Sequence, residues 1–204
     1  MKFNDIPGHE EVKSRLRHMV DVGRIPHALL LQGPSGIGKM AIARAFAQYV
    51  HCTDRRDGEP CGVCASCRQH QSFNHIDTHF VFPIVKRKSG SPAICDDFLP
   101  EWREYLTASP WMDYEKWIAA LDKANAQPVI YVDESVSLLR KLQYTARTAA
   151  FKIVIIWLPE KMNAECANKL LKMVEEPFED TLLVFVSNRP QEILPTIYSR
   201  LQRV

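Results

Sequence analysis

One segment, residues 28–50, constrains the fold of this chain more than any other. It runs from the apolar stretch Ala-Leu-Leu-Leu through Gln-Gly-Pro-Ser-Gly-Ile-Gly-Lys into an alanine-rich stretch that ends at Val50. Glycines at positions 33, 36 and 38 let backbone N–H groups face an anion, and Lys39 and the positive end of a helix add charge. The segment therefore predicts a strand, a phosphate-binding loop and a helix, which together form the centre of an α/β domain.

The position after the lysine departs from the usual phosphate-binding loop. Such loops place Ser or Thr there, because its hydroxyl binds the Mg²⁺ that accompanies a nucleoside triphosphate. This chain has Met40, and a thioether is a poor ligand for a cation that prefers oxygen. ATP or ADP without Mg²⁺ stays a candidate ligand, and a glycine-rich turn that binds nothing is the alternative. The candidate nucleotide-binding residues are Gly33, Pro34, Ser35, Gly36, Ile37, Gly38, Lys39, Met40 and Asn188.

Composition limits the class of protein. The chain has 204 residues, of which 46% are hydrophobic, and this is enough for a large core. No apolar run approaches the roughly 20 residues of a membrane span, and the N-terminus has no signal-peptide pattern. We therefore expect a cytoplasmic protein without membrane contact. A net charge of +2 argues against a globally basic surface that binds nucleic acid by itself.

A cysteine cluster follows the predicted helix directly. Its spacing, Cys-x8-Cys-x2-Cys-x2-Cys, lets four thiolates converge on one zinc ion, and a closed four-sulfur shell is structural rather than catalytic. Two disulfides are the alternative, which a reducing compartment disfavours. The predicted zinc ligands are Cys52, Cys61, Cys64 and Cys67. Because the thiolates fill the shell, four neighbouring histidines are interpreted as surface or helix-end residues: His51, His70, His75 and His79.

Further apolar runs complete a parallel sheet, since continuous runs are typical of strands that are buried on both faces. Strands are predicted near residues 28–32, 78–82, 152–158, 181–187 and 201–204. The central strand beside the loop, 152–158, ends in Trp157 and Leu158, where a hydrolytic site requires Asp and Glu. Asn188 follows the strand 181–187 and is expected to point into the crevice where ligands bind.

Two acidic residues offer a different assignment of the catalytic acids. Asp133 and Glu134 follow a short apolar run, as the metal-binding and water-activating acids of an ATPase do. However, an apolar stripe of helical spacing follows at 135–147, so Asp133 is interpreted as a helix N-cap. Asn163 is expected to cap a second helix, which Pro177 ends.

Residues 84–127 are predicted to be an inserted helical hairpin with a small apolar seam of its own, because they contain three of the four tryptophans. The basic run at 86–88 near its start is a candidate contact for a phosphate backbone. A solvated charge run is the more common role of such a segment.

Four signatures occur in one order along the chain: the phosphate-binding loop, the cysteine cluster, Asn168-Lys-Leu-Leu-Lys-Met-Val-Glu-Glu-Pro177 and Ser199-Arg200. Together they resemble the clamp-loader subunits of bacterial DNA polymerase III, the AAA+ gamma/tau and delta-prime proteins. The resemblance implies an AAA+ P-loop NTPase domain over residues 1–204 with strand order 5-1-4-3-2, a zinc lobe at 52–67, and lid and C-terminal oligomerisation domains beyond it. It also places Ser199 and Arg200 at a subunit interface, where the arginine reaches a neighbour's ATP.

The departures from the family pattern are similar to those of delta-prime, which does not hydrolyse ATP. Met40, Trp157 and Leu158 replace the groups that a motor subunit needs, and Leu201 stands where Cys often follows Ser-Arg. The resemblance then implies a heteropentameric ring with gamma/tau and delta that loads a sliding clamp on primed DNA, as part of a nucleotidyltransferase holoenzyme. The alternatives are an active gamma/tau-type motor and a zinc-bearing nucleic-acid-binding module with a vestigial loop.

Overall fold

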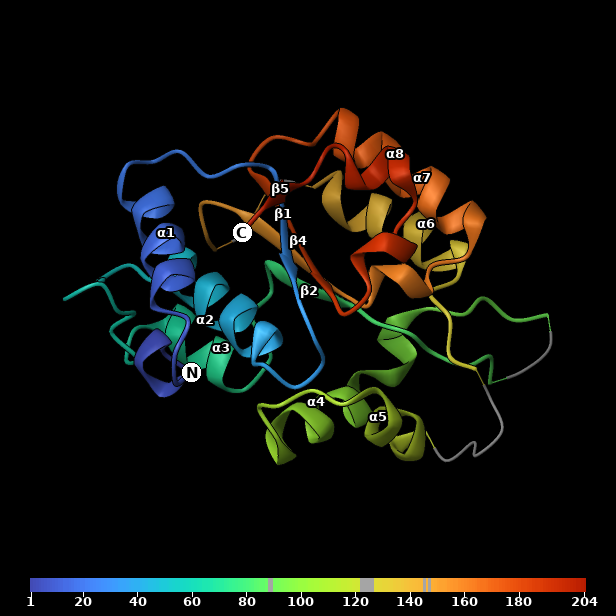
Figure 1. Cartoon of the computed structure of the whole chain (residues 1–204), viewed down its shortest axis with the longest axis horizontal. Helices are drawn as coiled ribbons and strands as arrows, with labels where there is room; N and C mark the ends of the chain where they lie inside the picture. Colours follow the sequence, from blue (N-terminus) through green and yellow to red (C-terminus); the bar gives the residue numbers. More distant parts are fainter. Residues whose placement is uncertain (88–89, 122–126, 145, 147) are drawn as a thin grey trace.

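The computed structural model describes residues 1–87, 90–121, 127–144, 146 and 148–204. Its sheet has five strands, β1 (Ala28–Gln32), β2 (Thr78–Val81), β3 (Lys152–Trp157), β4 (Thr181–Ser187) and β5 (Gln202–Arg203). The strand order is β2-β3-β4-β1-β5, and every pairing is parallel. The predicted five-stranded parallel sheet and its order are therefore confirmed (Figure 1).

The apolar runs form the buried central strands of the sheet. Every residue of β3 and β4 is buried, as are the first four residues of β1, so these strands form the centre of the sheet. Leu30 of β1 pairs with Phe185 of β4, and Ile155 of β3 pairs with Val184 of the same strand. The carboxyl ends of β1, β3 and β4 consequently lie side by side, and the phosphate-binding loop begins at this edge.

Helices cover both faces of the sheet. The helices are α1 (Glu10–Asp21), α2 (Lys39–His51), α3 (Ala65–Gln71), α4 (Leu99–Ala108), α5 (Tyr114–Ala120), α6 (Val132–Leu142), α7 (Ala164–Glu175) and α8 (Pro195–Tyr198). Short 3-10 turns lie at Phe3–Asp5, Cys95–Phe98, Pro159–Lys161 and Pro190–Glu192. Helices α1, α2 and α3 gather on one side of the sheet and α6, α7 and α8 on the other (Figure 1). No helix in the described ranges is both long and apolar enough to cross a bilayer.

The inserted hairpin exists, as α4 and α5, but the expected separate seam is wrong. The Trp102 ring stacks on Phe82 with centroids 4.0 Å apart and lies 5.4 Å from the ring of Trp157 at the end of β3. Trp117 of α5 packs edge-on against Trp102 and donates its indole N–H to the Pro83 carbonyl at 2.7 Å. The tryptophans thus pack the insertion against the main core. They can do so because β3 ends in apolar side chains, at the place where a catalytic site would have acidic side chains.

One of the two predicted helix N-caps is confirmed, and the other is wrong. Asn163 caps α7 as expected, since its side chain accepts a hydrogen bond from the Cys166 N–H at 2.8 Å. For α6 the prediction is wrong, because Tyr131 is the N-cap and Asp133 lies within the first turn. In α6, Leu138 and Leu142 are buried, whereas Val136 and Leu139 are only partly buried.

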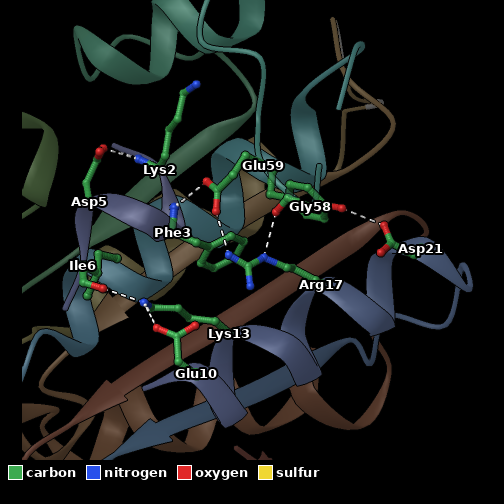
Figure 2. A network of polar contacts seen from close by, with 11 residues as sticks. Lys2, Phe3, Asp5, Ile6, Glu10, Lys13, Arg17, Asp21, Gly58 and Glu59 are labelled. Carbon is green, nitrogen blue, oxygen red and sulfur yellow. Dashed lines mark hydrogen bonds and ion pairs between the residues drawn. The ribbon is translucent and has the colours of Figure 1, made fainter. Parts of the chain in front are cut away.

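The N-terminal segment and α1 hold the cysteine lobe against the domain (Figure 2). Arg17 donates to the Gly58 carbonyl at 2.7 Å and to the Glu59 carboxylate at 2.6 Å. The other oxygen of Glu59 accepts the Phe3 N–H at 2.9 Å. Glu59 is 8% exposed, so its charge is compensated inside the protein by Arg17 and a backbone donor rather than by water.

Candidate functional site

The phosphate-binding loop has the backbone shape that its glycines predict. Gly33, Gly36 and Gly38 all have positive φ angles, and Gly38, at +90°, is the N-cap of α2. A side chain at Gly33 would place its Cβ only 2.8 Å from a methyl carbon of Ile37, so the loop requires glycine there. His9 fixes the loop from outside through a hydrogen bond of 2.8 Å between its Nε2 and the Ile37 carbonyl.

The Lys39 side chain folds back on this loop. Its amine donates to the Gly33 carbonyl at 2.8 Å and to the Pro34 carbonyl, and the residue is 7% exposed. Burial lowers the pKa of Lys39 to about 8, against the opposing attraction of the Glu160 carboxylate. The cation that would meet a phosphate is therefore bonded to the loop's own carbonyl oxygens.

Apolar side chains fill the space in front of the loop. Met40 and Trp157 are both 2% exposed, and Met112 from the insertion is 7% exposed. With Asn188 and the loop itself they bound a cavity of about 10 Å³. The predicted residues Gly36, Gly38, Lys39, Met40 and Asn188 thus meet at one place, and the described side chains that line it include no carboxylate or hydroxyl for a metal ion.

Glu160 is a residue of this region that the sequence analysis missed. Its carboxylate accepts hydrogen bonds from the Ser187 hydroxyl at 2.8 Å and from the backbone N–H groups of Asn188 and Arg189 at 2.9 and 3.1 Å. It lies in the turn after Leu158, which has the left-handed backbone conformation at φ +57°. The one sequence signal was its place as the first acid after β3. Its oxygens hold the end of β4 and are engaged within the chain.

A larger cavity of about 490 Å³ adjoins this turn, outside the carboxyl ends of β3 and β4. Ser35 of the phosphate-binding loop reaches it, and the insertion contributes Asp113 and Tyr114. Pro34 and Ile37 do not line either of these two cavities.

Asp133 and Glu134 accept hydrogen bonds from the backbone of the insertion. Asp133 accepts the Ala93 N–H at 3.0 Å, and Glu134 accepts the Cys95 N–H at 2.6 Å. Glu134 is 2% exposed, and burial raises the pKa of its carboxyl. Neither residue lines the cavity at the phosphate-binding loop. Their described contacts are those of side chains that anchor the segment before α4.

The four cysteines of the cluster have free thiols and converge as predicted. Their sulfur atoms all lie within 4.8 Å of one another. A tetrahedral zinc site with bonds of about 2.3 Å places its sulfurs about 3.8 Å apart, so the cluster fits this ion with small shifts. The N–H groups of Val63 and Cys64 point at the Cys61 sulfur, at 3.5 and 3.3 Å, and lower its pKa. These backbone donors therefore favour the thiolate form of Cys61, which is the form that binds metal, whereas burial raises the pKa of Cys52 and Cys67.

The histidine interpretation needs correction. His51 ends α2 and His70 lies in the last turn of α3, as a helix-end role requires, but these residues and His75 form a packed group in which His51 and His75 are buried and His70 is partly buried. The His51 Nδ1 and the His70 Nε2 are 2.9 Å apart, and the His75 ring stacks on His51 with centroids 4.2 Å apart. Backbone partners fix two tautomers: His51 Nε2–H donates to the Phe151 carbonyl at 2.9 Å, and His75 Nδ1 accepts the Asp77 N–H at 3.2 Å. The His75 Nε2 then faces the Ser66 hydroxyl at 2.9 Å.

Because of these packed histidines, we expect the protein to lose stability in acid. Burial lowers the pKa of His51 to about 3 and that of His70 to about 2, whereas unfolded histidines titrate near 6.5. Below about pH 6.5 the unfolded chain therefore binds more protons, and the free energy of unfolding falls by about 1.4 kcal/mol per pH unit for each such histidine. Urea unfolding at pH 7.0 and 5.5 in saturating zinc measures this. His70→Gln should flatten the dependence, and an equal slope in this variant would contradict the assignment.

Ser199 and Arg200 lie at the end of α8 on the surface. The Arg200 guanidinium donates to the Thr196 carbonyl at 2.8 Å and pairs with Glu175 of α7 at 2.7 Å. The Ser199 hydroxyl also donates to the Thr196 carbonyl, at 3.2 Å. The Arg200 side chain is 42% exposed, so these contacts orient it without burying it. They connect it to the helix that carries the Leu-Leu-Lys-Met-Val-Glu-Glu motif.

Comparison with known proteins identifies the family. The family model described as DNA polymerase III, delta subunit matches residues 8–204. The chain belongs to this family. It is 31% identical over 174 residues to the DNA polymerase III subunit delta' of Pseudomonas aeruginosa, covering 85% of the chain and 41% of that protein. It is 29% identical over 191 residues to the delta' subunit of Bacillus subtilis, covering 94% and 45% respectively.

Members of the gamma/tau type match as well. The chain is 28% identical over 198 residues to the gamma/tau subunit of Mycobacterium tuberculosis, covering 97% of the chain and 27% of that protein. The chain thus spans less than half of the length of each of these relatives. In fold it is similar to the Thermotoga maritima RuvB Holliday junction branch migration motor, with a TM-score of 0.51 at 14% identity over 99% of the chain and 46% of that structure. The DNA polymerase III clamp-loader family and a P-loop NTPase fold are therefore established, whereas the comparisons match both subunit types.

Proposed function

We propose that this chain is a subunit of the DNA polymerase III clamp loader that does not hydrolyse ATP, of the delta' type. The observation that carries the proposal is the filling of the space in front of the phosphate-binding loop by Met40, Met112 and Trp157. A hydrolytic site needs oxygen ligands for Mg²⁺ and a carboxylate that orients water. Here apolar groups occupy that space, and Lys39 is bonded to its own loop.

In this proposal the chain acts through its neighbours. Arg200 is an arginine finger that stabilises the phosphoryl group of ATP bound to an adjacent gamma/tau subunit, and Ser199 helps to place it. Gamma/tau and delta subunits are the partners in a heteropentamer, which brings the sliding clamp and primer-template DNA to the assembly. One structural zinc ion on the four cysteines holds the lobe at 52–67 folded.

Steady-state ATP hydrolysis by the full-length chain tests the proposal. We expect no turnover above that of a Lys39→Ala variant, with or without Mg²⁺, because no described acid lines the cavity at the loop. Turnover that depends on Lys39 and disappears in Asp133→Ala would instead favour a gamma/tau-type motor. Tight DNA binding by the isolated chain with a steep salt dependence would favour the nucleic-acid-binding module.

A further inference from the structure

The segment between α4 and α5, residues 109–113, lies against the phosphate-binding loop. A Cβ atom added to Gly38 would come within 2.7 Å of a carbon in the six-membered ring of Trp111. The indole therefore rests on the Cα of Gly38, at the first turn of α2. Figure 1 shows the α4–α5 hairpin beside the turn that connects β1 to α2.

The next residue, Met112, completes the closure. Its side chain is 7% exposed and lines the cavity with Gly36, Lys39 and Met40. The open volume of about 10 Å³ is roughly what a single water molecule needs. The inner part of the loop, at Gly38, Lys39 and Met40, is therefore closed to a phosphate group unless this segment moves, whereas Ser35 faces the larger cavity.

The segment is held in place by specific hydrogen bonds. The Tyr105 hydroxyl donates to the Asp113 carbonyl at 2.5 Å and accepts the Asp113 N–H at 2.8 Å. The Ser109 hydroxyl makes the same pair of contacts with the backbone of Trp111, each at 3.1 Å. Asp113 also caps α5 by accepting the Lys116 N–H at 3.2 Å. Two hydroxyls and a cap thus fix the backbone on both sides of Met112.

The loop underneath keeps the features of an anion site. Its three glycines have positive φ angles, and the amine of Lys39 lies beside the carbonyl oxygens of Gly33 and Pro34. Met112 and Trp111 lie in front of it and come from the insertion. We propose that the segment 109–113 is an intramolecular plug that closes a phosphate-binding loop still able to bind a nucleoside diphosphate once the plug is displaced.

The plug acts by competition. A nucleotide binds only the fraction of molecules in which the segment has moved away, so the apparent dissociation constant is the intrinsic constant divided by that fraction. Truncating Trp111 and Met112 removes the apolar contacts that keep the segment closed and opens the cavity. We therefore expect tighter nucleotide binding by a variant that gains no new contact with the ligand.

Isothermal titration of the full-length chain with ADP in the absence of Mg²⁺ tests the plug, because Met40 offers no oxygen ligand to the metal. The wild type is expected to bind weakly, and the double variant Trp111→Ala/Met112→Ala at least about tenfold more tightly. Adding Lys39→Ala to the double variant should remove the gain. Tyr144→Ala is the matched control, because this aromatic residue is 68% exposed and does not line the cavity at the loop.

A second variant tests the plug even if the double variant fails to fold. Tyr105→Phe retains the ring and removes only the hydroxyl that holds Asp113, and it should tighten ADP binding about threefold or more by loosening the segment. Equal ADP affinity in the wild type, the double variant and Tyr105→Phe would overturn the plug, as would tight binding by the wild type.

This inference concerns the same loop as the proposed function, and the two can fail separately. Binding measures the plug, whereas hydrolysis measures the proposed lack of turnover. A wild type that binds ADP tightly without hydrolysing ATP would overturn the plug alone. A double variant that binds ADP and hydrolyses ATP would support the plug and contradict the assignment of the residues that prevent turnover.

Discussion

Replacing Arg200 with alanine is expected to lower ATP turnover at the neighbouring motor site of the assembled clamp loader by about 10³-fold or more. An arginine supplied in trans stabilises the charge that develops on the transferred phosphoryl group, and this contribution is about 10³ to 10⁵ in kcat. The Arg200 side chain suits the role because it is 42% exposed yet oriented by the Thr196 carbonyl and by Glu175. Its removal leaves the buried core untouched.

The measurement is steady-state ATP hydrolysis by the reconstituted clamp loader in which the other motor sites are silenced at their own loop lysines. Arg189→Ala is the matched control, because Arg189 is also a surface arginine paired with a carboxylate, that of Glu192. Arg200→Lys should not restore turnover, since an ammonium cannot reproduce the planar two-pronged contact with phosphate oxygens. Unchanged turnover in Arg200→Ala would remove the arginine finger from the proposed function.

The sheet could be predicted because its strands are local and strongly apolar. The run 152–158 is long enough and uniform enough to be buried on both faces, and β3 occupies most of it. The weaker runs at 78–82 and 201–204 gave the edge strands β2 (Thr78–Val81) and β5 (Gln202–Arg203), whose ends differ from the predicted ends by at most one residue. The strand order required the family resemblance, because periodicity alone does not determine which strands pair.

The cysteine cluster could also be predicted from the sequence, because its ligands come from a span of 16 residues whose spacing restricts the geometry. The plug could not be predicted from the sequence, since Met112 lies 72 positions from Met40. The two residues come together because Trp102 and Trp117 pack the insertion on the core. The N-cap assignment of Asp133 failed for a related reason. Its carboxylate is engaged by the backbone of Ala93, a partner from the insertion that local helix signals do not reveal.

The histidine error has the same physical origin. A histidine next to a filled metal shell has no reason in sequence to be buried, and His51 was therefore assigned to the surface or a helix end. In the structure, the end of α2 meets α3 and the segment around His75, so three rings from separate places in the sequence pack against one another. Only the helix-end part of the prediction could come from local pattern.

Removing the metal is expected to have the largest effect on stability. Cys64→Ala leaves three thiolates, too few for a closed zinc shell, so the lobe at 52–67 should lose its fold. Glu59 lies within this lobe and pairs with Arg17 while accepting the Phe3 N–H. Losing the lobe also removes these hydrogen bonds to charged groups, each of which contributes about 1.5 to 3 kcal/mol. We expect a loss of at least that size in the free energy of unfolding.

Urea unfolding together with metal analysis measures this effect. The wild type should contain one zinc ion per chain and lose a similar amount of stability in a strong chelator, whereas the chelator should not affect Cys64→Ala further. Cys166→Ala is the matched control, because Cys166 is a buried thiol in α7 outside the cluster. This control should retain the full zinc content and lose only about 1 kcal/mol, the typical effect of a single substitution. A wild type that contains no metal and resists the chelator, with the four thiols paired as two disulfides, would contradict the zinc assignment. In that case the sulfurs that lie within 4.8 Å of one another would stabilise the lobe through covalent bonds instead of a shared ion.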